Sequence, residues 1–485
     1  MSSENKSVKM NMVMNALLTI SGFIFPLITF PYVSRILLPE GTGKVGLATS
    51  VIMYFSMFAR LGVPMYGVRA CAKVRDDKTE LSRTVHELLF INFFMVLIVY
   101  ILFVFSICFV PKLRSESTLY IIMGITILLD SLGVEWLYKG LEKYTYITVR
   151  SLIFKTISFV ALFIMVRTQS DYVIYGGLTV FAASASNILN FINLRKYIYI
   201  KSVGKYNWKR HIKMVLVFFS MSVATNIYAN LDTVMLGFIK DDVAVGYYNA
   251  AVKIKNILLG LVTSASVVLL PRTSYYADKG MMNEFFRVLK KTMHFVCLAG
   301  LSFSIYFIIF AKEGILFLSG KEYMGAIMPM MVIMPTLLLI GISHITGIEM
   351  MVPLGREKQV LYSEIVGAVV DLILNALLIP RYAATGAAIG TLVAEVSVLV
   401  WQLFVIRDIQ SKIFRDVPIL KVFISTLFAV SAAFWVKLLD INSFLSLVIS
   451  GICFFGVYAI ALLVLKDSLA IEILNIVLRK IKRNN

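Results

Sequence analysis

Five basic side chains fall inside long apolar stretches of the sequence: Arg35, Arg60, Lys155, Lys253 and Lys255. A charge in the hydrocarbon of a bilayer is costly unless it is paired or hydrated. One interpretation is a cationic cavity that binds an anionic group such as a pyrophosphate. Alternatively, the two arginines extend toward the membrane surface and the lysines form ion pairs. Glu135 lies at a depth that suits Lys155, and Asp232 at a depth that suits Lys253.

Acids and amides also fall inside or at the ends of apolar stretches. They are Asp130, Glu135, Asn226, Asn230, Asp232, Glu364, Asp371, Asn375 and Glu395. Asp371 and Asn375 are four residues apart and would share one helix face. Oxygen ligands from several helices suit a hard cation or a proton relay. The alternative is hydrogen bonding between membrane helices.

Other sequence patterns argue against nucleotide and metal chemistry. Gly41-Thr-Gly43-Lys-Val-Gly46 matches G-x-G-x-x-G, but an apolar helix precedes it where a dinucleotide site needs a buried strand. No phosphate-binding G-x-x-x-x-G-K-[ST] motif occurs. The four cysteines and four histidines are dispersed without ligand spacing. We therefore expect no enzyme activity, no cofactor and no bound catalytic metal.

The elements that must position these groups are membrane helices. Of the 485 residues, 59% are hydrophobic and 15% are charged, against about 25% charged residues in soluble domains. Apolar windows recur at the length that crosses a ~30 Å hydrocarbon core. We predict about fourteen spans, at 10–37, 43–63, 85–110, 117–138, 148–167, 171–194, 212–236, 245–270, 291–311, 322–346, 358–379, 383–406, 419–438 and 442–465.

The basic residues predict the orientation of these spans. Most of the 47 lysines and arginines fall in loops on the side of the N-terminus, and such loops remain in the cytoplasm. Both termini are therefore expected to be cytoplasmic. The net charge of +19 has the same explanation, so no nucleic-acid partner is expected.

Prolines and amphipathic segments add detail. Pro26 and Pro31 in the first span, and Pro329 and Pro335 in the tenth, predict kinks. The amphipathic segments are expected to lie along the inner leaflet. They are Tyr197–His211, Met281–Lys291 and Leu469–Ile481.

The first twelve spans look like two copies of one unit. Arg69 and Arg272, and Arg83 and Arg287, occupy matching places about 200 residues apart. Two six-helix lobes related by a pseudo-two-fold axis are a transporter architecture. The predicted parts are a first lobe at 1–194, a cytoplasmic linker at 195–211, a second lobe at 212–406, two extra helices at 407–465 and a basic amphipathic tail at 466–485.

Three motifs carry a family resemblance. They are Phe30-Pro-Tyr-Val-Ser-Arg-Ile-Leu-x-Pro-Glu-Gly41, Leu61-Gly-x-x-x-Tyr-Gly-x-Arg69 and Arg75-Asp-Asp-Lys-x-x-Leu-Ser. With the span pattern, the chain resembles the lipid-linked oligosaccharide flippases of Wzx type, in the multidrug/oligosaccharidyl-lipid/polysaccharide (MOP) exporter superfamily.

The resemblance implies a function and partners. Such proteins carry undecaprenyl-pyrophosphate-linked repeat units from the inner to the outer leaflet of the bacterial plasma membrane, for capsule or O-antigen-like polymers. Basic residues in the cavity are thought to hold the pyrophosphate. Membrane lipids surround the protein, and a polysaccharide polymerase and glycosyltransferases of the same pathway are expected partners. The family default is a monomer.

The resemblance also implies an ion-coupling site. Related lipid II flippases have a sodium site whose positions fall here near Asp232, Asp371, Asn375 and Thr391. The acid and the amide of the eleventh span stand in swapped order, so coupling to sodium or to protons both stay open.

Two other functions are weighed against a flippase. A multidrug cation exporter of the same superfamily should have an acidic or aromatic cavity, and the five in-span cations argue against it. A membrane polysaccharide polymerase or ligase should have a large external loop with catalytic Arg or His, and the expected external loops are short.

Overall fold

The computed structural model describes residues 3–415 and 417–484, and all regular structure in those ranges is helical. Side chains lie outside the description at 1–9, 12, 23, 221, 224–229, 265–268, 270, 271, 416, 477 and 480–485. The Asn226 prediction therefore lies outside the described side chains. The chain divides into two compact units, Met1–Gly246 and Tyr247–Asn485. Each unit is treated separately below.

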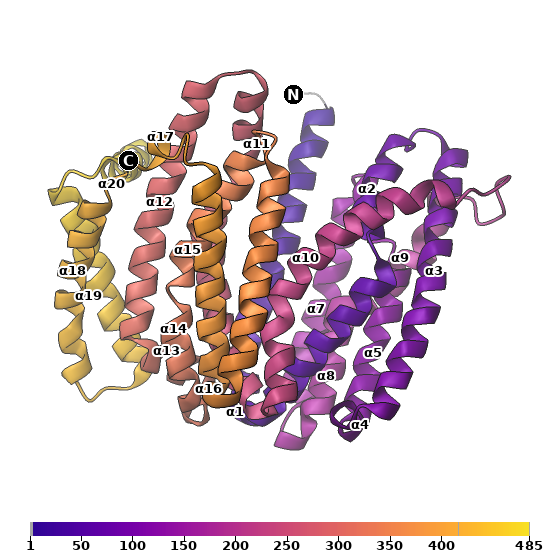
Figure 1. Cartoon of the computed structure of the whole chain (residues 1–485), viewed down its shortest axis with the longest axis horizontal. Coiled ribbons are helices and arrows are strands. Elements are labelled where there is room, and N and C mark those ends of the chain that lie inside the picture. The colour runs from indigo at the N-terminus through magenta and orange to yellow at the C-terminus, as the bar shows by residue number, and fades with distance from the viewer. Residues whose placement is uncertain (1–2, 416, 485) are drawn as a thin grey trace. The chain divides into compact units, whose positions relative to one another are not determined.

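The first unit is a bundle built around its longest helix, α1, which packs against α3, α5, α7, α8 and α10 (Figure 1). Its helices are α1 (Ser3–Arg60), α2 (Val63–Lys73), α3 (Lys78–Phe109), α4 (Pro111–Ser115), α5 (Ser117–Leu132), α6 (Glu135–Gly140), α7 (Tyr144–Met165), α8 (Tyr172–Val180), α9 (Asn187–Asn193) and α10 (Lys209–Ile239), with a π-helical turn at Phe181–Ala185. The unit ends one helix later than the predicted first lobe, because α10 packs on α1 and α2.

Helix α1 is two spans joined by a break. Its 58 residues would extend about 87 Å, nearly three times the ~30 Å hydrocarbon core. The helical path is broken at Leu38 (φ 57°), directly before Pro39, because a residue that precedes proline is disfavoured in the α conformation. The prolines at 26 and 31 lie inside the helix without a residue of non-helical backbone.

Gly43, the second glycine of the G-x-G-x-x-G match, serves close backbone packing together with Gly246. A Cβ atom on Gly43 would lie 1.7 Å from the carbonyl oxygen of Asp242, and one on Gly246 would lie 2.1 Å from that of Pro39. Only glycine permits the turn after the first span to approach the start of α11 so closely. Gly43 of this match is therefore explained by backbone packing.

The second unit begins within α11 (Asp242–Asp278). Its other helices are α12 (Met282–Ile309), α13 (Ala311–Ser319), α14 (Ile327–Ile333), α15 (Thr336–His344), α16 (Glu357–Val405), α17 (Ser411–Phe414), α18 (Ile419–Phe434), α19 (Ser443–Val464) and α20 (Ser468–Asn484), with a π-helical segment at Ile345–Met351. The last long pair, α18 and α19, lies side by side and α18 packs on α12 (Figure 1).

Two helical segments of the second unit are also interrupted, as α1 is. Helix α16 has 49 residues, about 74 Å, and its helical path breaks at Ala383 (φ 46°). The tenth predicted span is bent by 44° between Ile333 and Thr336, at Pro335, which confirms the kink predicted there. With α1 and α16 counted as two crossings each, and with α10 and α11 added to the nine helices and the bent pair that are apolar enough to cross a membrane, the long helices of the described chain provide for about fourteen spans.

The outer surface of the bundles is suited to lipid. Nine described helices, or ten with the bent pair, are long and apolar enough to cross a membrane. Large apolar side chains such as Phe93, Ile101 and Phe109 on α3 are exposed. The protein is therefore a multi-pass, all-helical membrane protein, as predicted.

The amphipathic segments differ from one another. Residues 198–208 form no regular helix, and their backbone is hydrogen-bonded to side chains of α3. Residues 282–291 are the first turns of α12 and continue into the ninth span. The tail forms the expected helix, α20, while the side chains of its basic end at 480–483 lie outside the description.

Candidate functional site

The first unit has a partly open cavity of about 550 Å³ whose lining combines polar and apolar side chains. Helices α1, α2, α3, α5, α6, α8 and α9 and the π-helical turn contribute to its wall. The polar lining consists of Thr49, Ser56, Arg60, Asn92, Thr126, Asp130, Glu135, Lys139, Thr179, Ser184 and Asn187. A volume between about 300 and 1,000 Å³ with a few convergent polar groups is typical of a ligand site.

Arg60 and Asp130 form an ion pair in this cavity. Their guanidinium Nη1 and carboxylate Oδ2 atoms are 3.5 Å apart. The other oxygen of Asp130 accepts hydrogen bonds from Ser184 Oγ at 2.6 Å and from Asn187 Nδ2 at 3.3 Å. Three elements thus hold the carboxylate in place, and the positive charge of Arg60 is balanced.

Glu135 and Lys139 form a second ion pair. Their side chains are one helical turn apart on α6, with Nζ and Oε1 separated by 3.0 Å. Lys155, for which Glu135 was the suggested partner, donates its hydrogen bond to Ser21 Oγ at 2.8 Å, and Glu135 lies near enough to attract its charge. The cavity wall contains two cations and two carboxylates, so its formal charge is zero.

Three polar atoms of the wall have no hydrogen-bond partner in the described part of the chain. They are Ser56 Oγ, Arg60 Nε and Asn92 Oδ1. Both Ser56 and Asn92 are only 3% exposed. Ser56 and Arg60 are four residues apart and lie on one face of α1. A buried polar atom without a partner is costly, so these atoms mark where a ligand or water would bind.

A buried arginine fixes the far wall of the cavity. Arg150 donates from Nη1 to the carbonyl oxygen of Ser186 at 2.6 Å and to Asn187 Oδ1 at 3.3 Å. Arg150 was not among the predicted site residues, although it falls in the predicted span at 148–167; α7 begins at Tyr144 and the residue is 6% exposed. Its position inside an apolar span was the sequence feature that could have identified it as a functional candidate.

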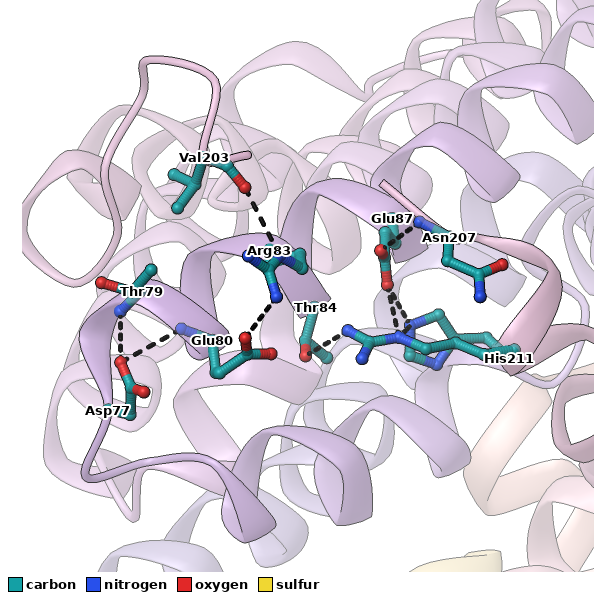
Figure 2. Close-up of polar contacts among 10 residues, drawn as sticks. Asp77, Thr79, Glu80, Arg83, Thr84, Glu87, Val203, Asn207 and His211 are labelled. Carbon is teal, nitrogen blue, oxygen red and sulfur yellow. Dashed lines mark hydrogen bonds and ion pairs between the residues drawn. The ribbon is translucent and has the colours of Figure 1, made fainter. Parts of the chain in front are cut away.

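A second polar cluster fixes the linker to the bundle (Figure 2). The fully buried carboxylate of Glu87 accepts hydrogen bonds from Asn207 N–H at 2.6 Å and Arg210 Nε at 2.8 Å. It also contacts His211 Nε2 at 2.7 Å, while His211 Nδ1 contacts Tyr66 Oη at 2.8 Å. The cluster therefore joins α2, α3 and α10. Glu87 was missed in the sequence analysis, although it is an acid within the predicted third span.

The same cluster extends to the start of α3. The side chain of Asp77 caps this helix by accepting from the N–H groups of Thr79 and Glu80 (Figure 2). Arg83 pairs with Glu80 and donates to the carbonyl oxygen of Val203 at 3.4 Å. The linker is thus held by side chains of one helix along its length.

The remaining in-span cations are distributed over both units. Arg35 is exposed on α1 and donates to the carbonyl oxygen of Pro31, while Lys155 is half-buried on α7. Lys253 and Lys255 are half-buried on α11 within the second unit. Of the five predicted residues, Arg60 is the one that lines the cavity.

Three of the four predicted ion-coupling residues come together in the second unit. Asp371 and Asn375 are buried on the first arm of α16 and face Gly390 on the second, where an added Cβ would lie 3.1 Å and 2.4 Å from their Oδ1 atoms. Thr391 is adjacent and contacts Tyr248 Oη at 3.0 Å. Asp232 is buried on α10 of the first unit. Among the described residues, no three His, Cys, Asp or Glu side chains form a metal-binding group.

Apolar helices that surround a cavity with polar side chains are typical of multi-pass transporters. Comparisons with known proteins agree with this class. Residues 8–277, more than half of the chain, match the family described as polysaccharide biosynthesis protein. The chain belongs to this family, which confirms the predicted membership.

Similar proteins and similar solved structures are also named as transporters. A putative O-antigen transporter of Escherichia coli (strain K12) is 26% identical over 84% of this chain and 99% of its own length. One from Shigella dysenteriae is 26% identical over 82% and 100%. In fold, the chain is similar to an inward closed lipid II flippase MurJ (TM-score 0.73, 16% identity, 93% and 99% covered). It is also similar to an inward-facing MATE family transporter of the MOP superfamily (TM-score 0.61, 15% identity, 83% and 99% covered). These are transporters, not enzymes, and the MOP fold predicted from the sequence is confirmed.

Proposed function

We propose that this protein is a flippase that moves undecaprenyl-pyrophosphate-linked oligosaccharides from the inner to the outer leaflet of the bacterial plasma membrane, by alternating access. The family match and two relatives named as O-antigen transporters, each similar over nearly its whole length, support the proposal. The cargo would serve a capsule or an O-antigen-like polymer.

The observation that carries the proposal is a cavity among apolar helices whose lining includes charged, amide and hydroxyl side chains. Transfer of an unpaired sugar hydroxyl or phosphate into hydrocarbon costs several kcal/mol per group. A flippase must therefore offer the head group polar partners inside the membrane while the lipid tail stays in the bilayer. The lining of charged, amide and hydroxyl side chains around Arg60 and Asp130 provides such partners.

We assign the pyrophosphate to in-span cations outside this cavity. Arg35, Lys155, Lys253 and Lys255 keep the role that the sequence suggested for them. Arg60 is set apart, because Asp130 balances its charge.

We propose that an ion gradient drives the cycle through Asp371, Asn375 and Thr391. Carboxylate, amide and hydroxyl oxygens around the Gly390 backbone are suitable ligands for sodium, and the carboxylate alone could carry a proton. Asp232, the fourth residue that the resemblance implies for ion coupling, is buried in the first unit. The proposal includes no other cofactor, a monomeric protein with both termini in the cytoplasm, and a polymerase and glycosyltransferases as pathway partners.

The test is the transbilayer location of the lipid-linked oligosaccharide in cells with and without the protein. Deletion should leave the intermediate in the inner leaflet, and the wild-type chain should restore its transfer. Lys253→Ala and Lys255→Ala should restore it poorly, while Lys201→Ala, an exposed linker residue, should behave as wild type. If the intermediate reaches the outer leaflet without the protein and only fails to polymerise, the flippase proposal is wrong.

A further inference from the structure

We propose that the cavity of the first unit binds the sugars of the lipid-linked oligosaccharide and not its pyrophosphate. This inference rests on the proposed flippase function and assigns one part of the cargo to one site. Four features of the wall support it: its charge balance, its unpartnered atoms, its aromatic side chain and its rigidity.

The charge balance disfavours a pyrophosphate. Arg60 is paired with Asp130, and Lys139 with Glu135, within the cavity wall. A pyrophosphate in this space would meet two carboxylates as well as two cations whose charges are already compensated. Like charges brought together oppose binding, whereas a neutral sugar carries no such penalty.

The unpartnered atoms require both donors and acceptors from the ligand. Arg60 Nε is a donor and needs an acceptor, while Asn92 Oδ1 is an acceptor and needs a donor. The Ser56 hydroxyl can do either. A fully ionised pyrophosphate offers acceptors alone and would leave Asn92 Oδ1 unsatisfied. Sugar hydroxyls both donate and accept, so an array of them satisfies all three atoms.

Trp136 adds an apolar surface to the cavity. Its ring is 5% exposed and packs against Gly67, where an added Cβ would lie 2.7 Å from ring atoms. This contact fixes the orientation of the ring. Sugars present C–H groups as well as hydroxyls, and a rigid aromatic side chain beside hydrogen-bonding groups suits that mixture.

The wall is held in place before any ligand binds. Ser184 and Asn187 fix Asp130, and Arg150 fixes Asn187 from behind. A preorganised set of polar groups discriminates strongly, because a ligand that lacks the matching hydroxyl leaves a buried group unpaired. The cavity is therefore expected to select among sugar structures.

Binding to the purified full-length protein in nanodiscs tests the inference. The probes are the oligosaccharide released by mild acid from the host's own lipid-linked intermediate and sugar-free undecaprenyl pyrophosphate. We expect Ser56→Ala and Asn92→Ala each to weaken binding of the oligosaccharide about tenfold and to leave that of undecaprenyl pyrophosphate unchanged. Ser56→Thr, which keeps the hydroxyl, should retain binding.

Ser425→Ala is the matched control. Ser425 is also fully buried with an unpartnered Oγ, but it lies on α18 in the second unit, outside this cavity. Because neither hydroxyl has a hydrogen-bond partner among the described residues, both variants should fold, and thermal unfolding would verify this. If Ser56→Ala binds the oligosaccharide as tightly as Ser425→Ala does, or if it loses undecaprenyl pyrophosphate instead, the inference is wrong.

The two proposals fail in different ways. Transfer of the intermediate without this protein overturns the flippase function. Intact transfer by the wild type, with oligosaccharide binding that is absent or indifferent to Ser56 and Asn92, overturns only the assignment of the cavity to sugars.

Discussion

Replacement of Glu87 by alanine should weaken the contacts that hold the linker, residues 195–211, against α3. The carboxylate is fully buried and accepts from Asn207 and Arg210, with His211 beside it (Figure 2). Without it, His211 and the Asn207 N–H lose a buried partner at once, and the guanidinium of Arg210 loses its counter-charge.

The expected cost follows from these contacts. Removal of one partner from a buried ion pair costs about 3–5 kcal/mol, because the other charge stays behind uncompensated. Arg210 is partly exposed and recovers some hydration, which places the expected loss near the lower value, about 3 kcal/mol. Glu142, which pairs with Arg75 at 3.1 Å with both side chains about half exposed, provides the matched control. Glu142→Ala should cost less than about 1 kcal/mol.

Two measurements on the purified protein in detergent test this prediction. The unfolding temperature should fall clearly in Glu87→Ala and change little in Glu142→Ala. Limited trypsin digestion should cut the linker at Lys201 and Lys205 faster in Glu87→Ala, since the backbone there is held through the cluster. Equal unfolding temperatures and equal cleavage rates for the two variants would show that the cluster does not anchor the linker.

Three further changes follow from single contacts. Gly43→Ala should prevent folding, since its Cβ would lie 1.7 Å from a carbonyl oxygen, whereas Gly22→Ala, with nothing within 4 Å, should be neutral or slightly stabilising by unfolding temperature. Hydrogen bonds from Arg356 lower the pKa of Asp408 in the folded protein. The stability that these bonds give is present above the pKa of an unfolded aspartate, about 4, and is lost as the pH falls through the folded pKa. The difference in unfolding temperature between the wild type and Asp408→Asn should therefore shrink as the pH falls from 5 toward 3. Asp467→Ala should free α20, because this buried carboxylate both caps the helix and contacts His294, and protease cleavage before α20 would report it.

The spans were predictable because hydropathy is a local property. A window of about twenty apolar residues has few alternatives to a membrane helix. The break at Leu38 was also accessible, since Pro39 and the following glycines mark it in the sequence. Gly43 of the motif match at Gly41–Gly46 is explained by close packing, and the structural context was sufficient to reject the nucleotide interpretation.

The cavity was not predictable, because its partners are far apart in the chain. Asp130 contacts Arg60, Ser184 and Asn187, which are 54 to 70 positions away. A single sequence shows which polar groups are buried in apolar spans, but it does not show which ones meet. The sequence therefore left the partners of Arg60 and Lys155 open, and the structure gives Arg60 a carboxylate and Lys155 a serine hydroxyl.

The pairing of Arg60 also changes how its variants should be interpreted. Arg60→Ala alone removes a cation and leaves the carboxylate of Asp130 without its counter-charge, so a loss of transport would not identify a pyrophosphate contact. The double variant Arg60→Gln with Asp130→Asn keeps the cavity neutral and keeps polar side chains at both positions. If the pair serves a neutral sugar site, the double variant should transfer more lipid-linked oligosaccharide than Arg60→Gln alone. If Arg60 instead holds the pyrophosphate by its charge, the second substitution should restore nothing, and the same leaflet assay distinguishes these results.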